Sequence, residues 1–113
     1  MTRSPGERLA DVLAAIDRTL TYRPHLGDAD PAVASMAYDA VLRNLAVIGE
    51  AVRSLPDGVK ARAVEVPWAS IAGLRNVVVH EYLRVDPAVI EDIVDRELVA
   101  LREVIRSRLL QVE

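Results

Sequence analysis

The spacing of hydrophobic and polar positions near the start of the chain is that of an amphipathic helix. Over residues 5–22 apolar side chains recur every three or four positions. Ser4 and Glu7 have the spacing of a capping box, and Pro5 occupies the first helical position. The polar segment 23–29 then interrupts the pattern. A first helix is therefore predicted for about residues 5–22.

A second helix is predicted to start at Asp30-Pro31, because Asp caps helix N-termini and proline fits their first turn. It runs to the stop signal at residues 55–58, and its alanines together with Gly49 favour close packing against a neighbouring helix. Its apolar positions are Met36, Ala37, Ala40, Val41, Ile48 and Val52.

Residues 56–66 are polar and basic and predict one extended connection, either a mobile linker or a loop that faces a substrate. A third helix is expected from Pro67 or Trp68, although the β-branched triplet 77–79 also has strand propensity. Trp68 is interpreted as a core or interface anchor. The inward positions of this helix are Ile71, Leu74 and Val78.

A fourth helix is predicted to start at Asp86-Pro87, which repeats the cap-and-proline pattern. Its apolar positions are Val89, Ile90, Ile93, Val94, Leu98, Leu101, Ile105 and Leu109. Four amphipathic helices predict an all-α fold, an antiparallel four-helix bundle forming a single domain over residues 1–113.

Composition narrows the chemistry that this bundle can carry. A chain of 113 residues with 51% hydrophobic residues can build one core. Cysteine is absent and the only histidines are His25 and His80, so neither a disulfide framework nor a zinc site within one chain is expected, and no cofactor is predicted. The N-terminus lacks a secretory pattern, and no uninterrupted apolar run approaches the roughly 18 residues of a membrane span. We therefore expect a cytoplasmic protein without membrane association.

The net charge of −3 argues against a protein that coats nucleic acid by electrostatics alone. Binding of RNA would require cations to gather around one cleft while acids such as Asp92, Asp95 and Glu97 lie elsewhere. For each cation the alternative is an ordinary solvated charge. The candidate cations are Arg43, Arg53, Lys60, Arg62, Arg75 and Arg84.

Polar chemistry is concentrated in the segment 75–82, which reads RNVVVHEY. The guanidinium of Arg75 is always cationic and the imidazole of His80 titrates near neutral pH, so together they can stabilise a phosphorane and move protons without a metal. The alternatives are a helix-end cap for His80 and a partly buried salt bridge, for example to Glu50, for Arg75.

The order R-x4-H-x-Y at Arg75, His80 and Tyr82 resembles the signature of the HEPN superfamily, and within it the HepT-like (DUF86) toxins. Two further segments, 43–51 and 67–76, resemble that family's RNLxxIGEA and PWxxIAGLRN segments and occur in the right order. The resemblance covers most of the chain.

This resemblance implies the toxin of a toxin–antitoxin system, a metal-independent endoribonuclease that cleaves tRNA or mRNA. It also implies a partner, a minimal nucleotidyltransferase antitoxin (MNT, or MntA), which transfers AMP groups to Tyr82 and so blocks RNA. Two alternatives stay open: a non-catalytic helical module that binds and assists a nucleotidyltransferase, and a plain helical interaction domain.

The spacing within the motif constrains the mechanism. At about 100° per residue, Arg75 and His80 diverge by roughly 140° around a regular helix, so one straight helix cannot aim both at one phosphate. Either the helix ends or distorts near His80, or a second copy of the chain completes the site. The resemblance implies the second case, a symmetric cleft at a homodimer interface.

The expected roles follow from the chemistry of RNA. His80 is predicted to act as the acid and base, Arg75 to clamp the phosphate, and Asn76, four residues before His80, to support them. A second polar group on the second predicted helix either lines the cleft or forms a structural hydrogen-bond network, and the network is favoured. This group comprises Arg43, Asn44 and Glu50.

Overall fold

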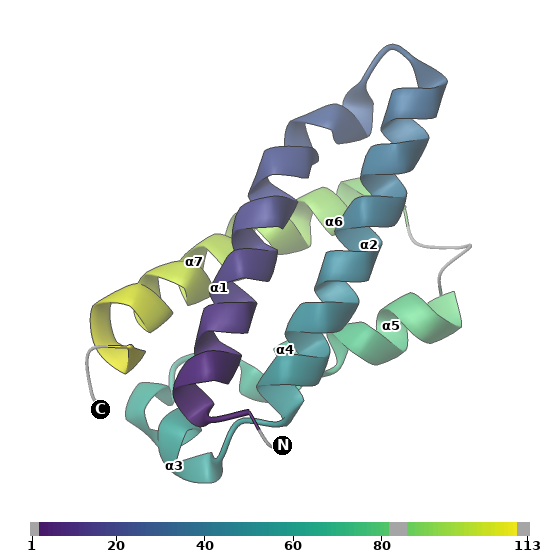
Figure 1. Cartoon of the computed structure of the whole chain (residues 1–113). Coiled ribbons are helices and arrows are strands. Elements are labelled where there is room, and N and C mark those ends of the chain that lie inside the picture. The colour runs from purple at the N-terminus through teal and green to yellow at the C-terminus, as the bar shows by residue number, and fades with distance from the viewer. Residues whose placement is uncertain (1–2, 82–85, 111–113) are drawn as a thin grey trace.

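The computed structural model describes residues 3–81 and 86–110, with backbone only for Val77, Val79, His80 and Glu81. The fold is all-α, and the described residues contain no strand. Two long helices, α1 (Pro5–Tyr22) and α2 (Pro31–Arg53), run antiparallel and are joined through a 3₁₀ helix at Arg23–Gly27. They lie side by side as a hairpin (Figure 1).

The second half of the chain completes an antiparallel four-helix bundle. The short helices α4 (Trp68–Ala72) and α5 (Leu74–Glu81) form its third helix, and both pack against α2. The fourth is a continuous helix that contains α6 (Pro87–Ile93) and α7 (Val99–Val104) and contacts α1. In Figure 1, α5 and α1 lie on opposite sides of α2.

The predicted helix starts are confirmed by their capping hydrogen bonds. The Ser4 hydroxyl accepts a hydrogen bond from the Glu7 backbone N–H at 3.1 Å, and the Glu7 carboxylate accepts one from the Ser4 N–H at 2.8 Å. Asp30 and Asp86 each accept a hydrogen bond from the backbone N–H two residues on, at 2.9 and 2.8 Å. These aspartates satisfy N–H groups that have no partner inside the helix.

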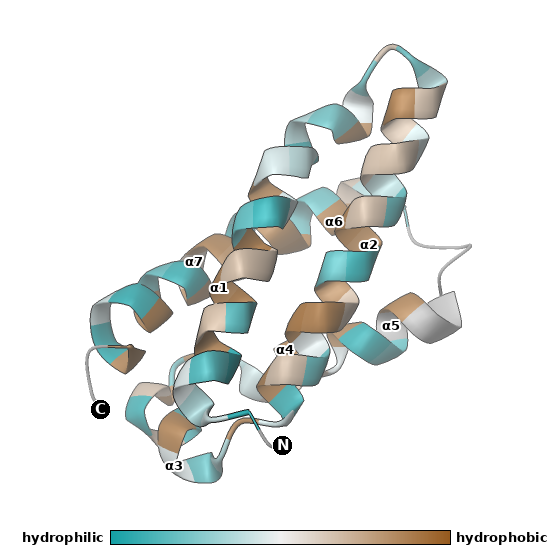
Figure 2. Cartoon of the chain, in the orientation of Figure 1, coloured by the Kyte–Doolittle hydropathy of each residue, from teal (hydrophilic) through white to brown (hydrophobic). Residues whose placement is uncertain are grey.

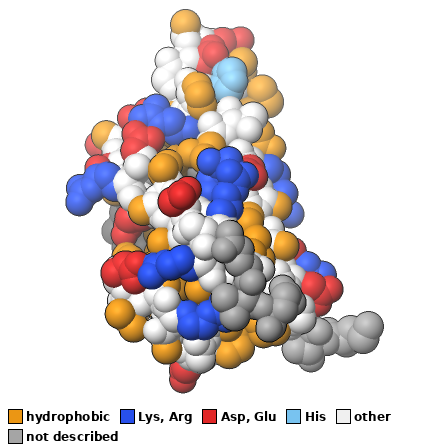
Figure 3. All heavy atoms as spheres, turned by 90° about the vertical axis from the view of Figure 1, so that its left-hand side faces the viewer, with side chains coloured by type: hydrophobic (Ala, Val, Ile, Leu, Met, Phe, Trp, Pro, Cys, Tyr) orange, Lys and Arg blue, Asp and Glu red, His pale blue; other side chains and the backbone are white. Residues whose placement is uncertain are grey.

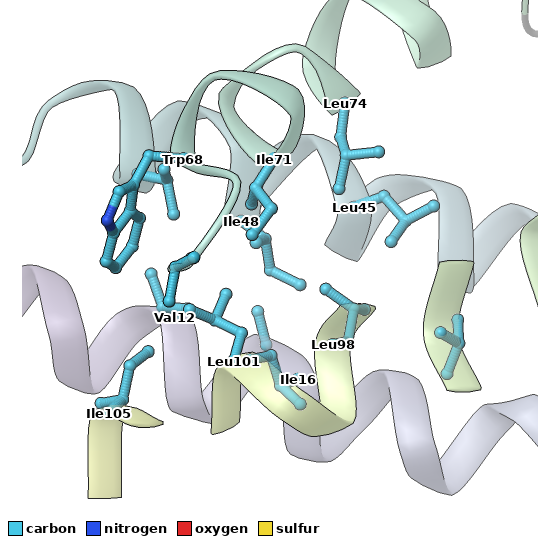
Figure 4. Close-up of a cluster of buried hydrophobic side chains, with 14 of the residues drawn as sticks. Val12, Ile16, Leu45, Ile48, Trp68, Ile71, Leu74, Leu98, Leu101 and Ile105 are labelled. Carbon is cyan, nitrogen blue, oxygen red and sulfur yellow. The ribbon is translucent and has the colours of Figure 1, made fainter. Parts of the chain in front are cut away.

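The bundle encloses a core of aliphatic side chains drawn from all four helices, several of which are drawn in Figure 4. A fully buried aliphatic side chain stabilises the fold by roughly 1.5–3 kcal/mol, whereas an exposed ion pair contributes about 0–1 kcal/mol. Burial therefore dominates. Apolar and polar positions alternate along the helices in Figure 2, as amphipathic packing requires. The core includes Val12, Ile16, Leu45, Ile48, Ile71, Leu98, Leu101 and Ile105.

The sequence predicts no membrane span, yet by length and composition α2 could cross a membrane. In the bundle, however, Val41, Leu45, Ile48 and Val52 of α2 are buried. Because α1, α4 and α5 pack along it, core packing accounts for its apolar composition.

The prediction of an extended connection over residues 56–66 was wrong. The segment contains the one-turn helix α3 (Asp57–Lys60) and a 3₁₀ turn at Ala61–Ala63. The buried indole of Trp68 stabilises these turns, because its Nε1–H lies 2.9 Å from the Ala63 carbonyl oxygen and 3.1 Å from that of Lys60. Trp68 is thus the core anchor that its sequence context predicted.

Two of the apolar positions that indicated the second and fourth helices are exposed, Met36 by 64% and Val89 by 52%. Met36 lies twelve residues before Ile48, which places it about 120° away around α2. Val89 is offset by about 100° from its buried neighbour Ile90. Both therefore point away from the core.

The C-terminal helix includes two π-helical segments, Val94–Leu98 and Ile105–Leu109. Its buried positions, from Ile90 to Leu109, advance 19 residues in five steps, or about 3.8 residues per step. A regular helix with 3.6 residues per turn would rotate this stripe by roughly 100° over that length. The wider π turns keep the stripe facing the core. The buried positions are Ile90, Val94, Leu98, Leu101, Ile105 and Leu109.

Candidate active site

The start of α5 approaches the backbone of α2 at Gly49. A Cβ atom added to Gly49 would lie 2.8 Å from the backbone N of Arg75 and 3.1 Å from the carbonyl oxygen of Ala72. Real Cβ atoms do not come this close to backbone atoms, so the packing of α5 on α2 requires glycine at this position. The absence of a side chain at Gly49 thus sets the position of Arg75.

Arg75 extends from the first turn of α5 toward the next residue of α2. Its Nε atom lies 2.9 Å from Oε1 of Glu50, and the two side chains are 45% and 57% exposed. The ion pair considered for Arg75 is therefore present, but it is exposed to solvent rather than buried. At this exposure it contributes about 0–1 kcal/mol to the fold.

The other motif residues are described only in part. Asn76 is exposed beside Arg75, and its backbone N–H donates to the Gly73 carbonyl at 3.0 Å. The backbone of α5 is helical through His80 to Glu81, so no break separates Arg75 from His80. Positions 75 and 80 therefore lie roughly 140° apart around the axis of α5. Tyr82 and Arg84 lie outside the described residues.

The polar residues of α2 divide between its two sides. Asn44 is 3% exposed; its Oδ1 accepts a hydrogen bond from Arg18 Nε at 2.9 Å, and its Nδ2 donates to the Ala40 carbonyl at 2.8 Å. Asn44 thus belongs to a structural network with α1. Arg43 and Glu50 are exposed, seven residues apart, and share one face of α2 to within about 20°.

The candidate cations do not all gather around one site. Arg43 and Arg53 lie on the exposed side of α2, within about 60° of Glu50, and neither forms an ion pair within the described parts of the chain. Arg62, in the 3₁₀ turn at Ala61–Ala63, contacts the C-terminal end of the last helix, where its Nη2 donates to the Leu109 carbonyl at 2.9 Å. Among the described candidate cations, Arg43 and Arg53 thus share the exposed side of α2 with Glu50, the partner of Arg75.

Charges elsewhere are largely paired across helices. Arg23 lies 2.7 Å from Asp95 and 3.7 Å from Glu91, and Arg102 lies 2.9 Å from Asp17. Figure 3 shows positive and negative side chains next to one another on the side of the molecule that it presents. The Arg102 pair links the C-terminal helix to α1, and the Arg23 pairs link it to the 3₁₀ helix at Arg23–Gly27.

The family model described as Ribonuclease HepT-like matches residues 12–108. The chain therefore belongs to the HepT-like ribonuclease family.

Individual relatives agree with this assignment. A protein of Thermococcus cleftensis named "Probable ribonuclease HepT" is 29% identical over 90% of this chain and 93% of its own length. One of Caldanaerobacter subterraneus subsp. tengcongensis, named "Putative RNase", is 36% identical over 66% of this chain. A protein of Methanocaldococcus jannaschii named "Gamma-glutamylcyclotransferase and putative RNase" is 27% identical over 84% of this chain. The chain spans 65% and 43% of the last two relatives, and no solved structure matches it.

Proposed function

We propose that the protein is a metal-independent endoribonuclease, the toxin of a toxin–antitoxin system, and that Arg75 and His80 are its catalytic residues. The observation that carries the proposal is the family match over residues 12–108, which includes the whole R-x4-H-x-Y motif. The exposed guanidinium of Arg75 supports it, because its partner Glu50 shares the exposed side of α2 with Arg43 and Arg53, which form no ion pair with the residues that the structure describes.

The proposed reaction uses the 2′-hydroxyl of RNA as the nucleophile. The imidazole of His80 removes its proton, a bond forms between the 2′-oxygen and phosphorus, and the bond from phosphorus to the 5′-oxygen breaks. A protonated imidazole gives a proton to the departing oxygen, leaving a 2′,3′-cyclic phosphate and a 5′-hydroxyl. The guanidinium of Arg75 stabilises the charge on the phosphorane oxygens, and Asn76 supports these groups.

The proposed active form is a homodimer. Because positions 75 and 80 lie roughly 140° apart around a helix whose backbone is continuous between them, we expect that one copy of α5 would not direct both side chains at one phosphate. A two-fold pairing would supply two arginines and two histidines, so that one imidazole can act as the base and the other as the acid.

The proposed regulation is transfer of AMP to Tyr82 by a minimal nucleotidyltransferase antitoxin in the cytoplasm. Tyr82 follows Arg75 by seven residues, a spacing that on a helix places both on one face. AMP phosphates on Tyr82 would then pair with the guanidinium and exclude RNA. Co-expression with the nucleotidyltransferase should add the mass of AMP to the wild type and not to Tyr82→Phe.

The catalytic proposal is tested by incubating mass-verified, unmodified protein with total tRNA and mRNA in excess EDTA. His80→Ala and Arg75→Ala should each lose about 10²–10⁴-fold in rate, with circular dichroism and sedimentation unchanged. Equal behaviour of all three proteins would reject it for these substrates. A protein that binds a nucleotidyltransferase without cutting RNA would instead be the non-catalytic helper module.

A further inference from the structure

Two consecutive residues of α2 position Arg75, one through its backbone and the other through its side chain. Gly49 lets the backbone N of Arg75 approach α2, and the carboxylate of Glu50 contacts the guanidinium Nε at 2.9 Å. The backbone and the far end of the side chain are therefore both fixed relative to α2. A flexible arginine is thereby held in a defined direction before any ligand binds.

The contact with Glu50 leaves most of the guanidinium available. A guanidinium has five N–H donors in a planar fork, and a phosphate is bound best by two of them in parallel. The described residues place one carboxylate, that of Glu50, at the Nε side of Arg75. The edge formed by the two terminal nitrogens can therefore receive two phosphate oxygens while Glu50 keeps its place.

The ion pair is poorly suited to stabilising the fold. Both side chains are about half exposed, and solvent screens such pairs so that their contribution to folding free energy is small. The ion pair matters more for the orientation of Arg75 than for the folding free energy, because an arginine side chain that is ordered before binding does not lose its rotational freedom when the substrate arrives.

We propose that Glu50 is a positioning residue that orients the Arg75 guanidinium toward the scissile phosphate. This inference rests on the proposed ribonuclease function and extends it to a residue outside the R-x4-H-x-Y motif. Glu50 acts through Arg75 and does not touch the reacting atoms. Its carboxylate also places a negative charge near the RNA, which opposes binding of the phosphate backbone.

The two effects of Glu50 predict opposite changes in kcat and in affinity. Glu50→Ala should lower kcat about 10–100-fold, because Arg75 loses its orientation, while the Kd for uncleavable 2′-deoxy-substituted RNA stays equal or falls. A purely structural residue would lower kcat and weaken binding together. The expected result is thus a slow enzyme that binds RNA at least as well as the wild type.

Two further substitutions separate geometry from charge. Glu50→Gln keeps an oxygen that can accept the Nε–H and removes the charge, so it should recover most of kcat and tighten binding. Glu50→Asp keeps the charge but is one methylene shorter, so it should remain slow without tightening binding. Glu103→Gln, on an exposed residue of α7, makes the same change in net charge and should match the wild type.

The outcomes distinguish this inference from the proposed function. If wild type cuts RNA, Arg75→Ala does not, and Glu50→Ala has wild-type kcat, then Glu50 has no positioning role and the ribonuclease function stands. If kcat, affinity and thermal stability all fall together in Glu50→Ala, the role is structural and the inference is overturned. If the wild type itself leaves RNA uncut, the proposed function fails and takes the inference with it.

Discussion

The two sides of α2 differ in the kinds of contact that they make with neighbouring helices. On the α1 side, two long helices bury aliphatic side chains between them, and Asn44 extends the contact through its hydrogen bond with Arg18. On the α5 side, a helix of eight residues also buries Leu74, and it adds a backbone contact at Gly49 and an exposed ion pair at Glu50.

One helix, α2, thus carries residues that stabilise the fold on one side and candidate functional residues on the other. Arg23 of the 3₁₀ helix and Arg102 of the C-terminal helix are paired with carboxylates of other helices. Arg43 and Arg53 of α2 have no such partner in the described residues. Paired charges hold helices together, and unpaired ones remain available to an anionic ligand. Substitutions on the two sides should accordingly affect different measurements.

The largest expected effect on stability is at the backbone contact on the α5 side. Gly49→Ala adds a methyl group that would lie 2.8 Å from the Arg75 backbone N. Relative to glycine, alanine stabilises a helix by about 1 kcal/mol. The overlap should outweigh this gain and destabilise the protein by about 1–3 kcal/mol net. Urea unfolding monitored by circular dichroism measures the change.

Gly58→Ala is the matched control, because no atom lies within 4 Å of the added Cβ and α3 has helical backbone there. It should be stabilising by about 0.4–1 kcal/mol. If Gly49→Ala were equally stabilising, the close approach of α5 to α2 would be incorrect.

On the α1 side, Asn44→Ala should destabilise the protein by about 1–2 kcal/mol, because two hydrogen bonds of a buried amide are lost. RNA cleavage at a temperature where the variant is folded should be unchanged. A double-mutant cycle with Arg18→Ala should give a smaller combined effect than the sum of the two changes. Strict additivity would show that the hydrogen bond between Arg18 and Asn44 is energetically unimportant.

The unpaired cations of α2 should determine how salt weakens RNA binding. Arg43→Gln and Arg53→Gln should each reduce the slope of log K against log salt by about 0.7, the value for one phosphate contact on a single strand. Arg8→Gln on α1 makes the same change in net charge and should leave the slope unaltered. Equal slopes for all three variants would assign the effect to total charge rather than to this surface.

The smallest expected effect concerns the ion pair between Arg23 and Asp95. A hydrogen bond from Arg23 lowers the pKa of Asp95 below its usual value. A lowered pKa in the folded state adds stability above the unfolded pKa of about 4, and this stability is lost as the pH falls through the folded pKa. Asp95→Asn should therefore unfold slightly more easily at neutral pH and show a shallower loss of stability below pH of about 4. Parallel stability profiles for the two proteins would contradict this linkage.

Most of the fold could be predicted from local signals, because caps and apolar spacing act over a few residues. The starts at Ser4, Asp30 and Asp86 were all correct. The turns over 56–66 were missed because they depend on hydrogen bonds from Trp68 to residues that precede it. The π segments correspond to a feature of the sequence, the long average spacing of the apolar positions from Ile90 to Leu109.

The site was predictable in its members and less so in its arrangement. The motif is visible in the sequence, and a partly buried ion pair of Arg75, for example with Glu50, was the alternative to its catalytic role. The pair is present, but its exposure to solvent was not predicted. The close helix packing that Gly49 predicted is confirmed, but its partner, the backbone of Arg75, lies 26 residues further along the chain and is not indicated by any local pattern. Arg62 was grouped with the site because its charge is visible in the sequence, whereas its carbonyl partner at Leu109 is not.

Trp68 is the only tryptophan in the chain, and its indole is buried with its N–H bonded to the turns that precede it. The protein thus carries a single built-in fluorophore, positioned at the base of the helix that leads into α5. Its emission can report docking of residues 56–66 in real time, during refolding or RNA titration, without any attached dye.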